Sequence, residues 1–147
     1  MRYFQRKHEE KHKFPLIIET FLLYLQRNYK LQILTPSSTT SASRRVQTNV
    51  CSWSARGTGR RRGAQIDLVI QRADDFTDLC ELKHSSSAFT IDKDYAEELQ
   101  NKIGAYQELS KDKRTLHLVM VTTNGVVRNS YYNLIQNEVT MDDLFAQ

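Results

Sequence analysis

The sequence has little of what marks secreted and membrane proteins. It has only two cysteines, Cys51 and Cys80, in 147 residues, which is too few for a disulfide framework and fits a reducing, cytosolic setting. No run approaches the roughly 18 apolar residues of a membrane span, because Pro15, Glu19 and Thr20 interrupt the longest apolar cluster. The N-terminus has no clear apolar segment followed by a small-residue cleavage site. We therefore expect a cytoplasmic protein with no membrane partner.

A nucleotide-binding loop is also missing. The glycines of residues 57–63 invite comparison with a phosphate loop, but the Walker pattern Gly-x4-Gly-Lys-Ser/Thr and its following helix are absent. No ATP site is expected in this chain. The loop does contain Arg60, Arg61 and Arg62. These arginines suit a DNA phosphate backbone, although a flexible, solvated loop is the simpler interpretation.

The charge distribution divides the chain into two parts. Residues 1–62 hold 13 Lys and Arg against 3 Asp and Glu, whereas residues 63–147 hold 8 against 14. Such asymmetry is typical of a basic nucleic-acid-binding arm on an acidic domain, and also of two halves with different origins. We expect an N-terminal basic segment at 1–45 and a folded domain at 46–147. Within the basic segment, the patterns predict a helix at about 16–29 and a Ser/Thr-rich linker at 35–43.

Hydrophobic periodicity predicts alternating strands and helices in the second part. The predicted elements are strands at 46–53, 64–70, 78–83 and 115–123, a helix at 93–109, a possible strand at 125–129, and a short terminal helix after the capping-box-like Thr140-x-x-Asp143. The helix has a stripe expected to be buried, formed by Tyr95, Leu99, Ile103, Tyr106 and Leu109. In the strand at 64–70, alternation places Ala64, Ile66, Leu68 and Ile70 on one face.

Three charged residues stand inside two of these apolar strands. Asp67 lies in the strand at 64–70, and Glu81 and Lys83 lie on one face of the strand at 78–83. A hairpin centred on Asp74 places Asp67 opposite Glu81, within cross-strand reach. Two like charges directly opposed are destabilising, so this arrangement favours a cation between them. The alternative is a salt-bridged cluster in which Lys83 neutralises one carboxylate.

The chemistry of these groups suits phosphodiester hydrolysis. Carboxylate oxygens bind Mg²⁺ or Mn²⁺, and the backbone carbonyl of Leu82 offers a third ligand. A metal there would activate a water and stabilise the leaving oxygen. The ammonium of Lys83 would orient or deprotonate that water, or stabilise charge on the phosphorus centre. Asp67, Glu81 and Lys83 are therefore the candidate catalytic residues, with Asp67, Glu81 and Leu82 as candidate metal ligands.

The pattern Ile66-Asp67-Leu68-Val69 followed by Cys80-Glu81-Leu82-Lys83 resembles the signature of the PD-(D/E)xK nuclease superfamily. The resemblance implies an α/β fold of the restriction-endonuclease type, a mixed central sheet flanked by helices in the order αβββαβ. Over about residues 50–147 the chain looks like the C-terminal nuclease-like domain of bacterial AAA-type ATP-binding proteins, through segments including 63–70, 79–83, 89–103, 118–128 and 138–145. DNA is the partner that the resemblance implies, with an ATPase domain or a second copy of the chain as further possible partners.

The sequence departs from the family pattern at two places. The superfamily usually has a further acidic residue on the first helix, and Glu19 is the only candidate for it. Some relatives carry Gln-x3-Tyr on the later helix, whereas this chain has Lys102-x3-Tyr106. The first 45 or so residues match nothing in the family. In the ATPase group that the chain resembles, the nuclease-like domain follows an ATP-binding domain, and since none is encoded here the chain is expected to be a fragment, a truncated product or a stand-alone relative. A catalytically degenerate nuclease fold that binds nucleic acid or an ATPase domain is the alternative function.

Overall fold

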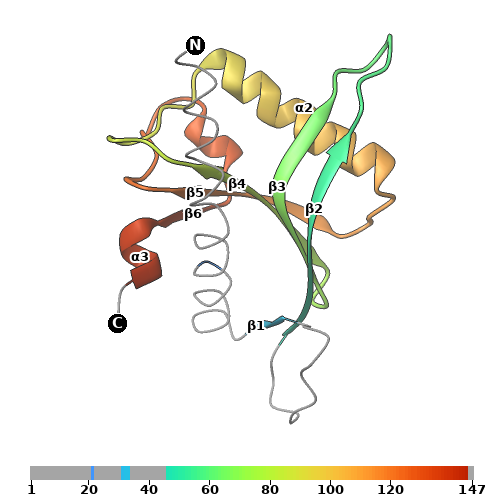
Figure 1. The fold of residues 1–147 in the computed structure, drawn as a ribbon, viewed down its shortest axis with the longest axis horizontal. Coiled ribbons are helices and arrows are strands. Elements are labelled where there is room, and N and C mark those ends of the chain that lie inside the picture. The colour runs from blue at the N-terminus through green and yellow to red at the C-terminus, as the bar shows by residue number, and fades with distance from the viewer. Residues whose placement is uncertain (1–20, 22–30, 34–45, 146–147) are drawn as a thin grey trace, which may run out of the picture.

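The computed structural model describes residue 21, residues 31–33 and residues 46–145. These residues form an α/β fold built on one six-stranded mixed sheet, whose strands stand in chain order, β1-β2-β3-β4-β5-β6 (Figure 1). The elements are β1 (Leu31–Ile33), β2 (Val46–Ala55), β3 (Ala64–Arg72), β4 (Phe76–Lys83), α2 (Lys93–Leu109), β5 (Thr115–Thr122), a short 3-10 turn (Tyr132–Leu134), β6 (Asn137–Thr140) and α3 (Met141–Phe145). No helix in the described ranges is long and apolar enough to cross a membrane.

Whether neighbouring strands are parallel or antiparallel follows from the segments that connect them. β2, β3 and β4 form an antiparallel meander, joined by a loop at residues 56–63 and a turn at residues 73–75. β4 and β5 are parallel and are joined through α2, and β6 is parallel to β5. The predicted hairpin register is confirmed from Leu68↔Cys80 to Gln71↔Thr77. The turn is tighter than the sequence pattern suggested, since β3 runs to Arg72 and β4 begins at Phe76.

The predicted helix at 93–109 is confirmed at both ends. Asp92 caps α2 by accepting a hydrogen bond from the backbone N–H of Tyr95 at 2.8 Å. Leu99 and Tyr106 are buried as expected, but Leu109, the last residue of the helix, is 43% exposed. The buried stripe instead includes Lys102, which the apolar pattern did not predict as a core residue.

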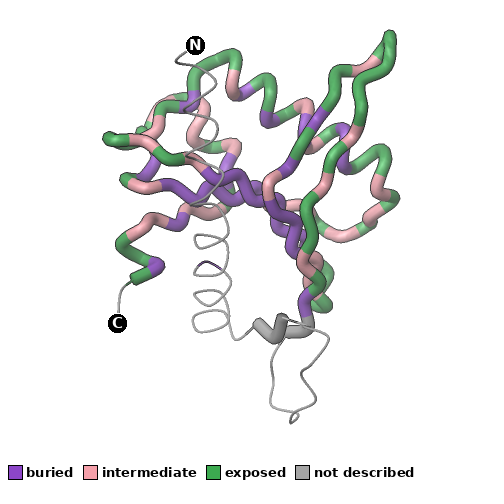
Figure 2. Tube along the Cα trace, viewed as in Figure 1, coloured by how far each residue is buried: buried purple, intermediate pink, exposed green. Residues whose placement is uncertain are grey.

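Two apolar layers cover the two faces of the sheet. On one face, α2 and the chain after β5 pack against residues such as Leu79, Leu118 and Met120. On the other face lies a cluster formed by Phe21, Leu68, Ile70, Cys80, Leu82, Val119, Val121, Val139 and Leu144. Figure 2 shows that burial is concentrated along the central strands of the sheet.

Residues before the predicted boundary at 46 take part in this fold. β1 pairs in parallel with β2, in the register Leu31↔Val46. Phe21 is helical and only 1% exposed, and it belongs to the core cluster on the face opposite α2. The remaining residues of the helix predicted at 16–29, the linker predicted at 35–43 and the candidate Glu19 lie outside the described residues.

The C-terminal predictions are confirmed in part. Thr140 and Asp143 form reciprocal hydrogen bonds, backbone N–H to side-chain oxygen in both directions, at the start of α3. The strand suggested at 125–129 is reduced to a single bridge between Val126 and Phe89. The predicted turn at Asn124-Gly125 is confirmed by a φ of +82° at Gly125, a backbone conformation that favours glycine.

Candidate functional site

A β-bulge in β3 sets the position of Asp67. Cys51 pairs with Val69 and Trp53 pairs with Ile66, so two residues of β3, Asp67 and Leu68, oppose a single residue of β2. The extra residue reverses the alternation of side chains. The prediction that Ile66 shares a face with Leu68 and Ile70 is therefore wrong, since Ile66 packs with Val69, Leu79 and Tyr106 on the α2 face.

The bulge also removes Asp67 from the β3–β4 ladder. Regular pairing between these strands ends at Leu68↔Cys80, so Asp67 has no ladder partner at Glu81. Its Oδ2 instead accepts a hydrogen bond from the backbone N–H of Leu82 at 2.9 Å. A residue in a strand directs its N–H and its C=O toward the same neighbouring strand. The Leu82 carbonyl therefore also faces the β3 side, where Asp67 lies.

Glu81 follows the predicted face of β4 and is almost completely buried beneath α2, at 1% exposure. Its Oε2 accepts hydrogen bonds from Lys102 Nζ at 2.6 Å and from the Tyr95 hydroxyl at 3.3 Å. Its Oε1 is buried and has no hydrogen-bond partner among the described residues. A buried carboxylate oxygen without a partner is unfavourable, so this atom indicates a place for a cation or a water.

The electrostatics of Glu81 and Lys102 follow from this burial. Loss of water raises the pKa of Glu81; the hydrogen bond and charge of Lys102 lower it, and the nearby charge of Asp67 raises it, with a net increase. Burial lowers the pKa of Lys102, but hydrogen bonds and charge from Glu81 and Glu98 outweigh that effect and raise it. Burial and the same carboxylates raise the pKa of Tyr95, so its hydroxyl remains a hydrogen-bond donor.

Lys83 lies on the same face as Glu81, as predicted, and the salt bridge that the alternative interpretation gave it is not formed with any described carboxylate. Its Nζ is 4.6 Å from the ring centre of Tyr95 and 6.0 Å from that of Phe89. Within the described part of the chain, no carboxylate oxygen lies within 4 Å of this ammonium. The residue that neutralises Glu81 is instead Lys102. Its place in the helical stripe, three residues after Leu99 and four before Tyr106, was the signal available in the sequence.

The three candidate DNA-binding arginines lie at the tip of the β2–β3 hairpin, which extends beyond the sheet (Figure 1). Arg60 and Arg62 are exposed, whereas Arg61 is half-buried and forms an ion pair with Glu108 of α2. A hydrogen bond of 3.3 Å from the Asn101 side chain to the Gly63 carbonyl also joins α2 to the base of this loop.

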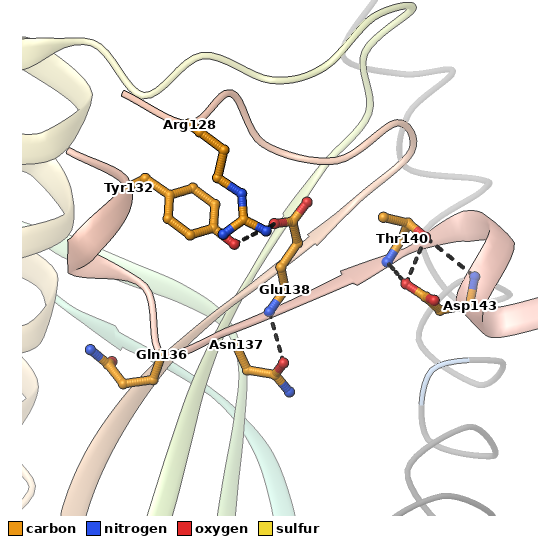
Figure 3. Close-up of a pocket in the computed structure, with 7 residues that line it drawn as sticks. All are labelled: Arg128, Tyr132, Gln136, Asn137, Glu138, Thr140 and Asp143. Atoms are coloured by element: carbon orange, nitrogen blue, oxygen red, sulfur yellow. Dashed lines mark hydrogen bonds and ion pairs between the residues drawn. The ribbon is translucent and has the colours of Figure 1, made fainter. Parts of the chain in front are cut away.

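Two surface hollows lie away from the carboxylates. One, of about 350 Å³, is lined by Arg128, Tyr132, Gln136, Asn137, Glu138, Thr140 and Asp143 (Figure 3). In it, the Tyr132 hydroxyl donates to Glu138 at 2.6 Å, and Arg128 lies 3.8 Å from the same carboxylate. The other, of about 480 Å³, is lined by Asp75, Asp112, Lys113, Arg114 and Thr115. Neither is lined by Asp67, Glu81 or Lys83.

The donor set around Asp67 and Glu81 is small. Among the described residues, no group of three or more His, Cys, Asp and Glu side chains is placed to hold a metal ion. Asp67 is bonded to the Leu82 backbone, and its charge acts on the neighbouring Glu81. Comparisons of the chain with protein-family models, curated proteins and solved structures found no match.

Proposed function

We propose that this chain is a metal-dependent nuclease-type domain that hydrolyses phosphodiester bonds in DNA. The observation that carries the proposal is the β3 bulge, which directs the Asp67 carboxylate onto the backbone of β4 beside Glu81. The carboxylate thereby lies against the backbone between Glu81 and Lys83, and its charge acts on Glu81. The order βββαβ from β2 to β5 agrees with the PD-(D/E)xK core that the sequence resemblance implies.

The oxygens at this point fit a hard divalent cation. Glu81 Oε1 is buried without a partner, and Asp67 uses only Oδ2 in its hydrogen bond to Leu82. With the Leu82 carbonyl they would hold Mg²⁺ or Mn²⁺, which bind oxygen and keep several waters. Such a cation would lower the pKa of a bound water and neutralise charge on the phosphate. Glu19 remains the proposed fourth ligand.

The chain's own residues have distinct roles in this proposal. Lys83 has its ammonium near the Tyr95 ring and, among the described residues, contacts no carboxylate, so it is available to a phosphate oxygen or to an attacking water. Tyr95 and Lys102 both bond Oε2 of Glu81, which leaves Oε1 as the oxygen that would bind the metal. Arg60 and Arg62, exposed on the hairpin, would contact the DNA backbone.

A second candidate function is supported by the Lys102–Glu81 ion pair. At 2.6 Å, a buried ammonium already neutralises the carboxylate, as expected in a nuclease fold that has lost catalysis and serves to bind nucleic acid or an ATPase domain. The structure of the pair is compatible with both functions, because only one oxygen of Glu81 is engaged.

A cleavage assay separates the two functions. Labelled single- and double-stranded DNA would be incubated with the full chain and Mg²⁺ or Mn²⁺, with EDTA as the metal-free control. We expect Asp67→Asn and Lys83→Met each to reduce cleavage at least ~100-fold, a loss of a kind seen when charge-stabilising groups are removed. Lys113→Met, at an exposed site, is the matched control. Cleavage that survives Asp67→Asn contradicts the mechanism, and DNA binding without cleavage by the wild type supports the second function.

A further inference from the structure

Lys102 is shared between two carboxylates of different exposure. Its Nζ lies 2.6 Å from Glu81 Oε2 and 3.2 Å from Glu98 Oε1. The Glu81 side chain is 1% exposed, whereas that of Glu98 is 49% exposed. Glu98 is one helical turn before Lys102 on α2, so the ammonium can pass from one acid to the other by rotation of its own side chain. Both contacts are formed at once, so the ammonium bridges the two acids, and Glu98 is in place to keep it if it withdraws from Glu81.

The net charge around the Glu81 carboxylate depends on whether the Lys102 ammonium contacts it. The groups that act electrostatically on Glu81 include Asp67, which is negative, and Lys83 and Lys102, which are positive. Lys102 is the only one of these two lysines in hydrogen-bond contact with the carboxylate. A cation added at Glu81 Oε1 would meet a positive charge on the other oxygen of the same carboxylate. Like charges at such separation in a buried setting repel strongly.

We propose that Lys102 is a built-in counter-cation that lowers the affinity of the Asp67–Glu81 carboxylates for a divalent metal. Tight metal binding then requires the ammonium to leave Glu81 for Glu98. The inference rests on the metal site of the proposed function and adds a means of regulating it: metal occupancy is linked to the position of one lysine on α2. The negative charge of a bound phosphodiester would offset the excess positive charge, so metal and DNA are expected to bind cooperatively.

The opposite role for Lys102 gives the opposite result. If the lysine serves only to hold Glu81 so that Oε1 points toward a metal, its removal weakens metal binding. If it is a counter-cation, its removal strengthens metal binding. The sign of the change therefore decides between the two roles, whatever the catalytic activity.

The test is Mn²⁺ binding to the full chain by isothermal titration calorimetry, with folding of each variant checked by circular dichroism. We expect Lys102→Met to bind Mn²⁺ about tenfold or more tightly than the wild type, and to gain a larger increase in Tm on addition of Mn²⁺. Lys102→Gln keeps a hydrogen-bond donor to Glu81 and serves if the methionine variant does not fold. Lys113→Met, on the surface, is the control and should bind as the wild type does.

Two further results separate this inference from the function on which it rests. In the first, Asp67→Asn loses Mn²⁺ binding, but Lys102→Gln binds Mn²⁺ no more tightly than the wild type does. This result overturns the counter-cation role and leaves the metal site intact. An absence of Mn²⁺ binding in the wild type and in both Lys102 variants overturns the metal site, and the counter-cation role with it. Tighter binding by Lys102→Gln that is abolished by adding Asp67→Asn supports both.

Discussion

The Asp67 carboxylate accepts a hydrogen bond from the backbone N–H of Leu82 at the point where β3 and β4 cease to pair. The side chain thus takes the place that a β3 carbonyl would occupy in a regular ladder. Leu82 is 8% exposed, so its N–H has little access to water and needs this partner. One carboxylate therefore completes the sheet through one oxygen and keeps the other for the candidate site.

Substitutions at Asp67 should separate its structural role from its charge. Asp67→Ala leaves the Leu82 N–H without a partner, and we expect a loss of about 1–3 kcal/mol in the free energy of unfolding. Asp67→Asn keeps an acceptor oxygen and should lose clearly less. Urea denaturation followed by circular dichroism measures both. Equal losses for the two variants would show that the hydrogen bond to Leu82 contributes nothing.

The buried Glu81–Lys102 pair should show strong energetic coupling. Glu81→Gln or Lys102→Met alone leaves the other group buried without its charged partner, at a cost of about 3–5 kcal/mol. The double variant should lose much less than the two single losses added together. A double-mutant cycle from denaturant unfolding gives the coupling energy. Additive losses would mean that the two charges do not interact across the 2.6 Å contact.

Asp112 should make the stability of the protein sensitive to acid. Burial raises the pKa of Asp112, but hydrogen bonds from the Arg114 backbone and the Thr77 and Tyr106 hydroxyls outweigh it and lower the pKa to about 2. A carboxyl group whose pKa falls on folding stabilises the folded protein fully at pH values above its unfolded pKa of 3.8. This stabilisation is lost as the pH falls through the folded pKa of about 2.

The test of this pH dependence compares the wild type with Asp112→Asn. Above pH 4 the wild type should be the more stable, and the difference in the free energy of unfolding should shrink between pH 4 and pH 2. Denaturant unfolding at several pH values measures it. A difference that stays constant over this range would exclude a lowered pKa at Asp112.

Phe21 should contribute to the stability of the whole fold. The side chain is 1% exposed in the core cluster with Leu68 and Ile70, and Phe21→Ala should cost about 3–5 kcal/mol. Phe145→Ala is the matched control, since Phe145 is 63% exposed and surface changes usually stay within about 0.5 kcal/mol. Both values come from denaturant unfolding.

Limited proteolysis provides an independent check on the same residue. If Phe21 packs as described, cleavage N-terminal of residue 46 should destabilise the remaining domain. A fully stable fragment of residues 46–147 would instead confirm the domain boundary expected from composition, and would mean that Phe21 and β1 add nothing to the fold.

Local patterns were sufficient for much of the fold. The spacing of Tyr95, Leu99 and Tyr106 predicted the bounds of α2, and alternation in β4 correctly placed Glu81 and Lys83 on one face. Turn residues near Asp74 predicted the register of the hairpin. In each case the signal lies within one element or one short connection, where period and turn chemistry decide the structure.

The remaining features depend on contacts between distant elements. The bulge at Asp67 arises from the pairing of β3 with β2, so a perfect alternation in β3 alone predicted the wrong face for Ile66. The spacing of Lys102 places it in the buried stripe of the helix, but its partner Glu81, 21 residues earlier, is known only once α2 lies over the sheet. Arg61 likewise reads as free until α2 brings Glu108 to the hairpin. A single sequence contains no local signal for such partnerships.

The order of the strands in the sheet has a consequence for folding. Because strands that follow one another in the chain are neighbours in the sheet, the β3–β4 hairpin can form early through local contacts and the other strands can add on either side of it. Glu81 then stands on a water-exposed face until α2 docks. Dehydration of this carboxylate and its meeting with Lys102 occur together in that one step. We therefore expect docking of α2 to be the slow phase of refolding, and the phase most sensitive to salt.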